Sequence, residues 1–590
     1  MTSLFKKEHG ESMAKESVGM GRRTGRRRRR GRARVDGHGT RKPPRSPRRR
    51  DVPSSAIERA AHRLGIEVLR PQQTRIIEHV LKHKDALAVL PTGFGKSACY
   101  QVPSMLLKAP VVVVSPLLAL LQDQYEKLIA REIPTVRLDS TVRGKARREA
   151  LERLSRGGSL LVMTTPETLA SDEVSKALKG GISLVAVDEA HASSEWGHDF
   201  RPAYLRLGEV LGRYGATATL GLTATATEAV RKDLVRILNL KDPLIVAESP
   251  DRPNLRFDVI PCSGAARLRA LGRLVLRLGR PGIIYCSTTR DVDAVYGALG
   301  KLRIPVQRYH GKMTGKQRRE QQELFMRRGR RVIMVATSAF GLGIDKPDIR
   351  YIMHYQTPAS LEQYVQEAGR AGRDGNSAHC VLLYDPEDRQ IHEFLLSRSR
   401  IRPDQLVRLA ATLTSWIEEG REPSLSDLAG TAGLARRVAQ ALVAVFEDAG
   451  LVSMTSAGIV ETLVAAEALE RDSRLLIQRL THLRDRDANR LDSVAHYATT
   501  ERCRAQLLRE YFGVPAGHVC GSCDICQGGS RRPDSFFKPL QPLKKTVRGR
   551  NRRRGRRRRR GAARPPTQNA PPRVASGNTR SPVGSLPTDD

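Results

Sequence analysis

The 590-residue sequence contains no apolar run that approaches the ~18 to 20 residues of a membrane-spanning helix. Its first residues are polar and lack the apolar segment of a secretory signal peptide. We therefore expect a soluble protein that is neither inserted in a membrane nor secreted. Because single hydrophobic cores stop growing near ~250 to 300 residues, the length predicts several domains.

Acidic residues are scarce at both ends. Residues 1–50 contain 18 Lys and Arg against 4 Asp and Glu, and residues 538–590 contain 16 against 2, so the ends supply most of the net charge of +40. Each end carries the string GRRRRRG. Such segments bury no core, so we expect disordered tails at 1–52 and 531–590. They are predicted to bind phosphates without sequence preference; solubilising or nuclear-targeting tails are the alternative.

Short apolar runs alternate with helical patterns in two parts of the chain, from residue 85 onward and again after the string DRPNLRF at 251–257. Apolar runs without alternation indicate strands that are buried on both faces, hence parallel sheets covered by helices. We predict α/β lobes at 53–250 and 251–397. A small helical region at 398–475 and a cysteine-bearing module at 476–530 are expected to follow.

A glycine-rich turn, LPTGFGKS, follows the first apolar run. Gly93 and Gly95 allow backbone N–H groups to approach a phosphate chain at the start of a helix. Lys96 can reach the β- and γ-phosphates, and Ser97 can ligate Mg²⁺. Leu90 stands where the full pattern has its first glycine, so a plain glycine turn is the alternative.

An acidic pair, Asp188 and Glu189, ends a later apolar run, at the sheet edge where open α/β folds bind ligands. Asp188 can hold Mg²⁺, and Glu189 can orient and deprotonate an attacking water. Such a pair by itself is usually a solvated strand end. The glycine-rich turn earlier in the same lobe favours a nucleotide site.

The second lobe carries the string SLEQYVQEAGRAGRDG. If it is a helix, Gln366, Arg370 and Arg373 fall at positions i, i+4 and i+7 and share a face. A solvated basic face is one interpretation. The other is a face that meets a triphosphate held by the first lobe, where an arginine stabilises transition-state charge. The latter predicts a cleft that closes on ATP and opens after hydrolysis.

Together these motifs resemble the RecQ family of DNA helicases, within helicase superfamily two. The matching strings, in the family's order, are LRPQQ, PTGFGKS, VVVSPLLALLQDQ, VDEAH, WGHDFRPAY, LTATAT, GIIYC, YHGKM, ATSAFGLGIDKP and QEAGRAGRDG. DEAH occurs in many helicases, whereas WGHDFRP after it is characteristic of this family. The resemblance covers about residues 56–390 and 495–527 and implies two RecA-like lobes, with ATP, Mg²⁺ and Zn²⁺ as cofactors.

The resemblance also implies roles for matching residues. Arg70 and Gln73 would contact adenine. The residues implied to bind the phosphates and Mg²⁺ are Thr92, Gly93, Gly95, Lys96, Ser97 and Asp188. Glu189 would be the general base, and Arg373 the arginine finger with Arg370 beside it. Thr223 and Thr225 match the motif that links nucleotide state to lobe movement.

The segment from Trp196 to Arg201 matches an aromatic-rich loop that, in the family, senses single-stranded DNA and signals to the ATP site. Base stacking on an aromatic ring is worth ~1 to 3 kcal/mol, against ~0.6 to 2.2 kcal/mol for a DNA stacking step. Stacking can therefore bias a single base step; core packing is the alternative. The residues predicted to couple DNA to the ATP site are His191, Trp196, Phe200, Arg201, Thr223 and Thr225. Glu195 departs from the family pattern and puts a negative charge near this contact.

Four of the eight cysteines are clustered. Cys503, Cys520, Cys523 and Cys526 follow the pattern C-x16-C-x2-C-x2-C. Four thiolates suit a closed, structural Zn²⁺ site, and the spacing matches the family's zinc module. An iron–sulfur cluster is the alternative. The other cysteines are scattered through apparent strands and helices, where we expect small buried hydrophobes: Cys99, Cys262, Cys286 and Cys380.

Residues 424–460 show a short helix, a glycine-bearing turn, a longer helix that begins near Arg436 and Arg437, and a strand-like end. This pattern resembles a winged helix; a simple packing domain is the alternative. In the family the winged helix follows the zinc module. We therefore expect a short form that lacks the usual C-terminal domains after that module.

The combined prediction is a monomeric, Mg²⁺- and ATP-dependent DNA helicase. It would act on single-stranded and forked DNA in recombination, repair or replication-fork processing. The 3′ to 5′ polarity is what the resemblance implies. Single-strand-binding or recombination proteins are the expected partners. The expected location is a bacterial cytoplasm near the nucleoid, or a nucleus if the chain is eukaryotic. The alternatives are an RNA or RNA–DNA unwinding ATPase, and an annealing or packaging protein in which ATP switches affinity.

Overall fold

The structure, a computed structural model, describes residues 52–194, 207–327, 332–341, 344–399, 402–455 and 458–528. The basic tails and the predicted DNA-sensing residues Trp196, Phe200 and Arg201 lie outside these ranges. Among the described helices, none combines the length and the apolar character that crossing a membrane requires.

The first lobe is a sheet of seven strands in the order β3-β4-β2-β5-β6-β1-β7, in which every neighbouring pair is parallel. The strands are β1 (Ala86–Val89), β2 (Val111–Val114), β3 (Thr135–Leu138), β4 (Leu161–Thr164), β5 (Leu184–Val187), β6 (Thr219–Thr223) and β7 (Leu244–Ala247). The helices are α1 (Ser54–Arg63), α2 (Pro71–Leu81), α3 (Ala98–Ser104), α4 (Leu118–Ile129), α5 (Gly144–Ser155), α6 (Pro166–Leu169), α7 (Asp172–Ala177), η1 (Ala190–Ser193), α8 (Leu207–Arg213) and α9 (Glu228–Ile237).

Burial on both faces explains why the strand sequences are apolar throughout. In β2, Val111 and Val113 pack into one hydrophobic cluster, whereas Val112 and Val114 pack into another. Successive side chains of a strand point to opposite faces, so both faces of this sheet are covered.

The second lobe is a sheet of six strands in the order β10-β11-β9-β12-β13-β8, again parallel throughout. The strands are β8 (Leu255–Pro261), β9 (Gly282–Tyr285), β10 (Val306–Tyr309), β11 (Ile333–Ala336), β12 (Tyr351–His354) and β13 (Ala378–Tyr384). The helices are α10 (Gly264–Arg277), α11 (Thr289–Lys301), α12 (Gly315–Met326) and α13 (Leu361–Ala368). The predicted pair of RecA-like lobes is confirmed.

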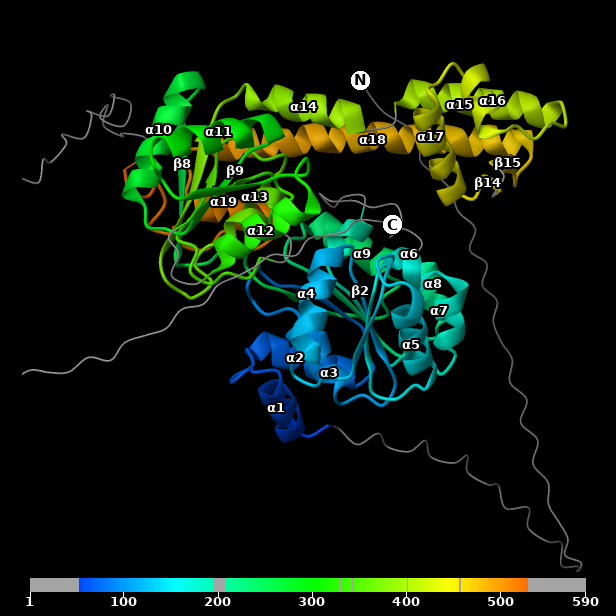
Figure 1. Ribbon diagram of the computed structural model, residues 1–590, viewed down its shortest axis with the longest axis horizontal. Helices are drawn as coiled ribbons and strands as arrows, with labels where there is room; N and C mark the ends of the chain where they lie inside the picture. The colour runs from blue at the N-terminus through cyan, green and yellow to red at the C-terminus, as the bar shows by residue number, and fades with distance from the viewer. Residues whose placement is uncertain are drawn as a thin grey trace, which may run out of the picture.

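Helices follow the second lobe, as predicted. The elements are α14 (Asp388–Ser399), α15 (Pro403–Glu418), α16 (Leu425–Thr431), α17 (Arg436–Asp448), β14 (Val452–Met454), β15 (Val460–Thr462), α18 (Ala466–Thr499) and α19 (Arg504–Tyr511). In Figure 1, α18 (orange) runs from the small helical region at the right back to the second lobe (green). The predicted boundary between residues 475 and 476 falls inside α18, so a continuous helix joins the two regions.

The small helical region has a core of its own, to which α15, α16, α17 and the hairpin contribute. Strands β14 and β15 pair antiparallel, and a single antiparallel bridge joins Ser424, before α16, to Ile459, directly before β15. Within 424–460 the predicted short helix, longer helix and strand-like end correspond to α16, α17 and the hairpin, and the winged-helix interpretation stays a prediction.

We call residues 500–528, which contain α19 and the four clustered cysteines, the cysteine module. Its Leu507 and Leu508 share a hydrophobic cluster with the core of the second lobe. Arg504 and Asp524 form a buried ion pair, with Nε to Oδ1 at 3.0 Å and Nη2 to Oδ2 at 3.1 Å. Asp524 also accepts a hydrogen bond from the backbone N–H of Val259 in β8, at 3.0 Å. The module is thus anchored to the edge of the second sheet.

Asp524→Ala is expected to destabilise this junction by about 3 to 5 kcal/mol, because it leaves the Arg504 charge buried without its partner. Hydrogen exchange should show faster exchange of the Val259 amide, together with a lower melting temperature. The control is Asp492→Ala, which breaks an exposed pair with Arg389 between α14 and α18 and should cost no more than ~1 kcal/mol. Equal effects of the two variants would contradict this account.

Candidate nucleotide site and cysteine cluster

The phosphate-binding turn, residues 90–97, connects β1 to α3. Gly93 and Gly95 adopt φ angles of 83° and 85°, which favour glycine. A Cβ atom on Gly95 would lie 2.7 Å from Nε2 of Gln73, and one on Gly93 would lie 3.3 Å from Cγ of Arg373. Both glycines are therefore required by conformation and by close neighbours.

Gln73 holds this turn in place. Its Nε2 donates to the carbonyl oxygens of Phe94 and Gly95, at 3.1 and 2.9 Å. The guanidinium of Arg70 lies 4.5 Å from the centre of the Phe94 ring. As far as the described residues define it, the wall of the adjoining cavity does not include Arg70 or Gln73. Their predicted contact with adenine stays a prediction.

Asp188 and Glu189 follow β5, whose neighbour β6 separates it from β1. Asp188 is buried, and its Oδ1 accepts a hydrogen bond from the Glu189 N–H at 3.0 Å. Burial and the adjacent Glu189 charge raise the pKa of Asp188 to about 7, while the Lys96 ammonium acts in the opposite direction. A bound cation would favour the carboxylate, so this oxygen ligand suits Mg²⁺.

His191 connects the acidic pair to β6. Its Nδ1 lies 3.4 Å from Oε2 of Glu189 and 3.0 Å from Oγ1 of Thr223. The Thr223 hydroxyl donates its own proton to the carbonyl oxygen of Thr225, at 3.1 Å. The histidine Nδ1 must then be the donor toward Thr223. His191, Thr223 and Thr225 are therefore joined by hydrogen bonds, and the Glu189 carboxylate lies next to this chain at an ion-pair distance from His191.

The arginine loop, residues 369–375, differs from the prediction. A helix was expected to carry Gln366, Arg370 and Arg373 on one face, but α13 ends at Ala368. The chain then turns, and Gly372 adopts a φ of 56°. Gly372 lies three residues beyond the helix C-cap, Gly369, so its left-handed conformation belongs to the loop that follows the helix. The two arginines therefore reach the site from a loop, although they lie on the same cavity wall as Gln366.

Both arginines are held by oxygen atoms of their own lobe. The Arg370 guanidinium donates to the carbonyl oxygen of Gly341. Nη1 of Arg373 lies 2.7 Å from Oδ1 of Asp345. Burial and the neighbouring Arg370 lower the pKa of Arg373, while Asp345 opposes this shift.

A cavity of about 380 Å³ lies between the two lobes. The first lobe contributes Thr92, Gly93, Gly95, Lys96, Ser97, Asp188 and Glu189, and the second contributes Gln366, Arg370 and Arg373. The wall thus combines cations for phosphate oxygens, oxygen ligands for a hard cation, and a carboxylate for an attacking water. This arrangement suits a nucleoside triphosphate bound with Mg²⁺.

Two further residues at the site had no role in the sequence-based prediction. Gln124 in α4 donates from Nε2 to the Ser97 hydroxyl at 3.3 Å and accepts a hydrogen bond from Tyr100 at 2.5 Å. Asp345 pairs with Arg373. Both lie within strings that match the family, but their partners come from distant segments.

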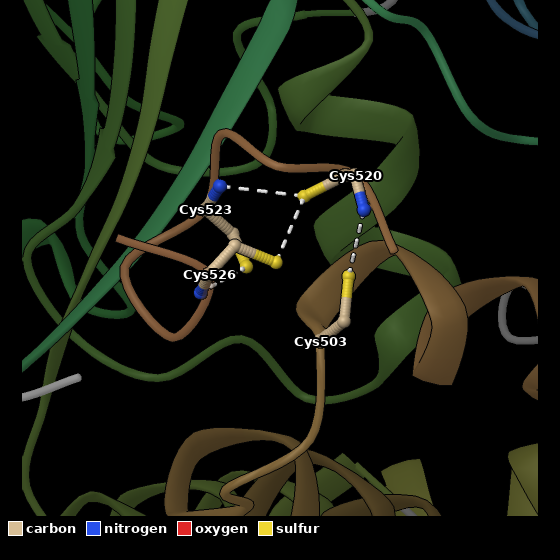
Figure 2. A group of neighbouring side chains, drawn as sticks. All are labelled: Cys503, Cys520, Cys523 and Cys526. Atoms are coloured by element: carbon tan, nitrogen blue, oxygen red, sulfur yellow. Dashed lines mark hydrogen bonds between the residues drawn. The ribbon is translucent and has the colours of Figure 1, made fainter. Parts of the chain in front are cut away.

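The four clustered cysteines lie together, as Figure 2 shows. Their sulfur atoms are all within 4.8 Å of one another, and Sγ of Cys520 is 3.9 Å from Sγ of Cys526. Tetrahedral Zn²⁺ with Zn–S bonds of ~2.3 Å places its sulfur ligands ~3.8 Å apart. An iron–sulfur cluster inserts several irons and sulfides between the thiolates, so the spacing favours a single ion.

Backbone groups prepare this cluster for a cation. The N–H groups of Cys520 and Cys523 donate to the sulfur atoms of Cys503 and Cys520, at 3.2 and 3.3 Å. Burial acts to raise the pKa of the Cys520 thiol, but hydrogen bonds from the backbone of Ser522 and Cys523 outweigh it and lower the pKa to about 6. Burial raises the pKa of Cys523 to about 12 and also raises that of Cys526. Cys520 thus favours the thiolate that binds metal, whereas a bound cation would have to displace the protons of Cys523 and Cys526.

Comparison with known families gives three matches along the chain. A DEAD/DEAH box helicase model matches residues 70–233, and a helicase conserved C-terminal domain model matches 266–375. A RecQ zinc-binding model matches residues 467–527, which include all four clustered cysteines.

Curated relatives extend these matches. The ATP-dependent DNA helicase RecQ of Synechocystis is 34% identical over 496 residues, which cover 80% of this chain and 98% of that protein. The probable ATP-dependent DNA helicase RecS of Bacillus subtilis is 36% identical and covers 65% and 77%. The ATP-dependent DNA helicase RecQ of Bacillus subtilis is 40% identical, and the alignment spans 58% of each chain, little more than half of that relative's length.

The purified protein is expected to contain one Zn²⁺ per chain and to show no visible absorption band, because four thiolates close a single tetrahedral site. Cys523→Ser should abolish the metal content, measured by elemental analysis. Cys262→Ser, which changes a cysteine outside the cluster, should retain it. Stoichiometric iron with a broad visible absorption would overturn the zinc assignment.

Proposed function

The chain belongs to the RecQ family of helicases, and from this premise we propose that it is an ATP-dependent DNA helicase. It would translocate 3′ to 5′ along single-stranded DNA and unwind forked or tailed duplexes during recombination, repair or replication-fork processing. ATP would bind between the lobes with Mg²⁺ held by Ser97 and Asp188.

The observation that carries this proposal is the convergence of Lys96, Glu189 and Arg373 on one cavity from two separate lobes. Lys96 donates to the carbonyl oxygen of Leu90 at 3.3 Å, and Arg373 pairs with Asp345. A triphosphate would offer both cations stronger anionic partners. Binding would therefore draw the lobes together, and hydrolysis would release them.

The chain from Glu189 through His191 to Thr223 supports a route between DNA and hydrolysis. Because η1 ends at Ser193, directly before the aromatic-rich segment, a strand bound there would act on the segment that positions Glu189. A shift of His191 would change the distance between its Nδ1 and the carboxylate of Glu189, the proposed general base. DNA stimulation of ATP hydrolysis is the expected consequence.

The winged-helix-like region does not have the charge of a general DNA-binding surface. Residues 402–465 contain 5 Arg and Lys against 8 Asp and Glu, although Arg436 and Arg437 are exposed at the start of α17. Affinity for the phosphate backbone follows the number of cationic contacts. We therefore assign the sequence-independent grip on DNA to the two basic tails.

The decisive experiment is an unwinding assay on forked duplexes and on duplexes with a 3′ or a 5′ tail, with DNA and RNA compared as activators of ATP hydrolysis. We expect ATP-dependent unwinding of the forked and 3′-tailed DNA, and loss of unwinding and hydrolysis in Lys96→Ala.

Lys108→Ala is the matched control, since Lys108 is exposed and precedes β2, at the end of the parallel strands opposite to the nucleotide site. Stronger activation by RNA would favour the RNA or RNA–DNA alternative. Strand separation that persists in Lys96→Ala but disappears without the tails would favour an annealing or packaging protein.

Removal of residues 1–52 and 531–590 should reduce the salt dependence of DNA binding. If the tails engage ~6 to 10 phosphates, the full chain should lose about 10³ to 10⁵ in affinity between 50 and 200 mM salt. The shortened chain should show a shallower slope, measured by fluorescence anisotropy. An unchanged slope would refute the assignment of this grip to the tails.

A further inference from the structure

The interlobe linker, residues 248–254, contacts the arginine loop at its backbone. Nη1 of Arg252 donates to the carbonyl oxygens of Gly369 and Ala371, at 2.9 and 3.0 Å. Its Nη2 donates to the carbonyl oxygen of Gly372. One side chain therefore binds the backbone on both sides of Arg370 and directly before Arg373.

These carbonyl groups follow the end of α13, where helical hydrogen bonds no longer satisfy them. A cation at a helix C-terminus is also favoured by the helix dipole. Asn254 adds to the contact, since its Nδ2 donates to the carbonyl oxygens of Gly372 and Asn376, at 2.8 and 2.9 Å. The linker thus binds three carbonyl groups of the arginine loop and that of Asn376, the residue after it.

The cysteine module holds the linker in turn. Nη1 of Arg509, in α19, lies 2.6 Å from Oδ2 of Asp251, the residue next to Arg252. The same guanidinium donates to the carbonyl oxygens of Ala516 and His518, which lead to Cys520. The ion pair is largely buried, with side-chain exposures of 12% and 23%. It therefore ties the linker to the loop that carries the cysteine cluster.

The same end of the module contacts both lobes. The Tyr511 hydroxyl donates to Oε1 of Glu362, in the first turn of α13, at 2.9 Å. Nη1 of Arg231, in α9 of the first lobe, donates to the carbonyl oxygen of Phe512 at 3.0 Å. Helix α19 and the residue after it thus reach the start of α13, the linker and the first lobe.

We propose that Arg252 is a positioning residue for ATP hydrolysis, which sets the backbone of the loop that carries Arg370 and Arg373. The Asp251–Arg509 ion pair extends this control to the cysteine module, so that the module sets how the loop meets the first lobe. The inference rests on the proposed ATPase activity and deepens it. The side chain of Arg252 acts through the loop and needs no contact with nucleotide.

The position of the arginine loop should affect the rate of ATP hydrolysis more than the affinity for nucleotide. The phosphate-binding turn belongs to the first lobe, where Gln73 holds it, and these contacts do not involve the linker. An arginine finger contributes mainly to the transition state. A displaced loop should therefore lower kcat while the affinity for nucleotide stays close to that of the wild type.

The test is DNA-stimulated ATP hydrolysis by the full chain, with the affinity for a fluorescent ATP analogue measured in parallel. Arg252→Gln should lower kcat by about 10- to 100-fold, because a misplacement of ~1 Å can cost ~10²-fold. Its nucleotide affinity should fall much less than its kcat, because the phosphate-binding turn of the first lobe is unaltered. Arg252→Lys retains the charge but cannot reach three carbonyl groups at once, so its kcat should be intermediate. Arg373→Ala, which removes the proposed arginine finger itself, should lower kcat the most, by about 10³-fold or more.

Arg408→Gln is the matched control and should keep wild-type kcat, since Arg408 lies on α15 and pairs with Asp404 at an exposed position. Wild-type kcat in Arg252→Gln would overturn the inference while leaving the proposed function intact. Absence of DNA-stimulated hydrolysis in the wild type would instead refute the proposed function. An equal loss of affinity and kcat in Arg252→Gln, with a lower melting temperature, would show a merely structural role.

A double-mutant cycle tests the ion pair independently. Asp251→Asn and Arg509→Gln should each lower kcat. The double variant should be no slower than Arg509→Gln, because that change already removes the ion pair together with the bonds of Arg509 to Ala516 and His518. Zinc content should be retained in all three. Two outcomes would overturn this half of the inference by showing that the cysteine module does not affect hydrolysis. One is a double variant whose loss of kcat is the product of the two single losses, and the other is single variants with wild-type kcat.

Discussion

The close approach of the two lobes at the phosphate-binding turn is the constraint on which the rest of the site depends. A Cβ atom on Gly369 of the second lobe would lie 3.0 Å from Cβ of Thr92 in the first, and Gly93 meets the Arg373 side chain at a similar distance. Because Gly93 and Gly369 have no side chains, the two backbones can approach closely, and Lys96 and Arg373 reach the same cavity. A larger side chain here would separate Lys96 from Arg373.

Three cations at this junction already have an oxygen partner within the protein. Lys96 is bound to the carbonyl oxygen of Leu90, Arg370 to that of Gly341, and Arg373 to the Asp345 carboxylate. A buried cation without a partner would be costly. In the absence of nucleotide, these protein oxygens therefore take the place of the phosphate oxygens. Under the proposed function, nucleotide replaces these partners, and the exchange favours a closed arrangement of the lobes.

The sequence predicted much of the fold because its signals are local. Continuous apolar runs such as Val111–Val114 became strands buried on both faces, and the glycines at 93 and 95 became the turn between β1 and α3. The prediction that one helix carries Gln366, Arg370 and Arg373 was wrong, because α13 ends at Ala368, before the two arginines. Helix α18 crosses an expected boundary because its helical pattern continues through it.

By itself the sequence determined the two lobes, the glycine turn, the acidic pair and the four-cysteine pattern, since each depends on residues close together in the chain. Only the tertiary structure decided which distant groups meet. Arg252 binds carbonyl groups after α13, Arg509 pairs with Asp251, and Gln73 holds the phosphate-binding turn. The physical reason is that an arginine or an amide can donate to many different oxygen acceptors. Its actual partner is the oxygen that the packed elements bring within hydrogen-bond distance.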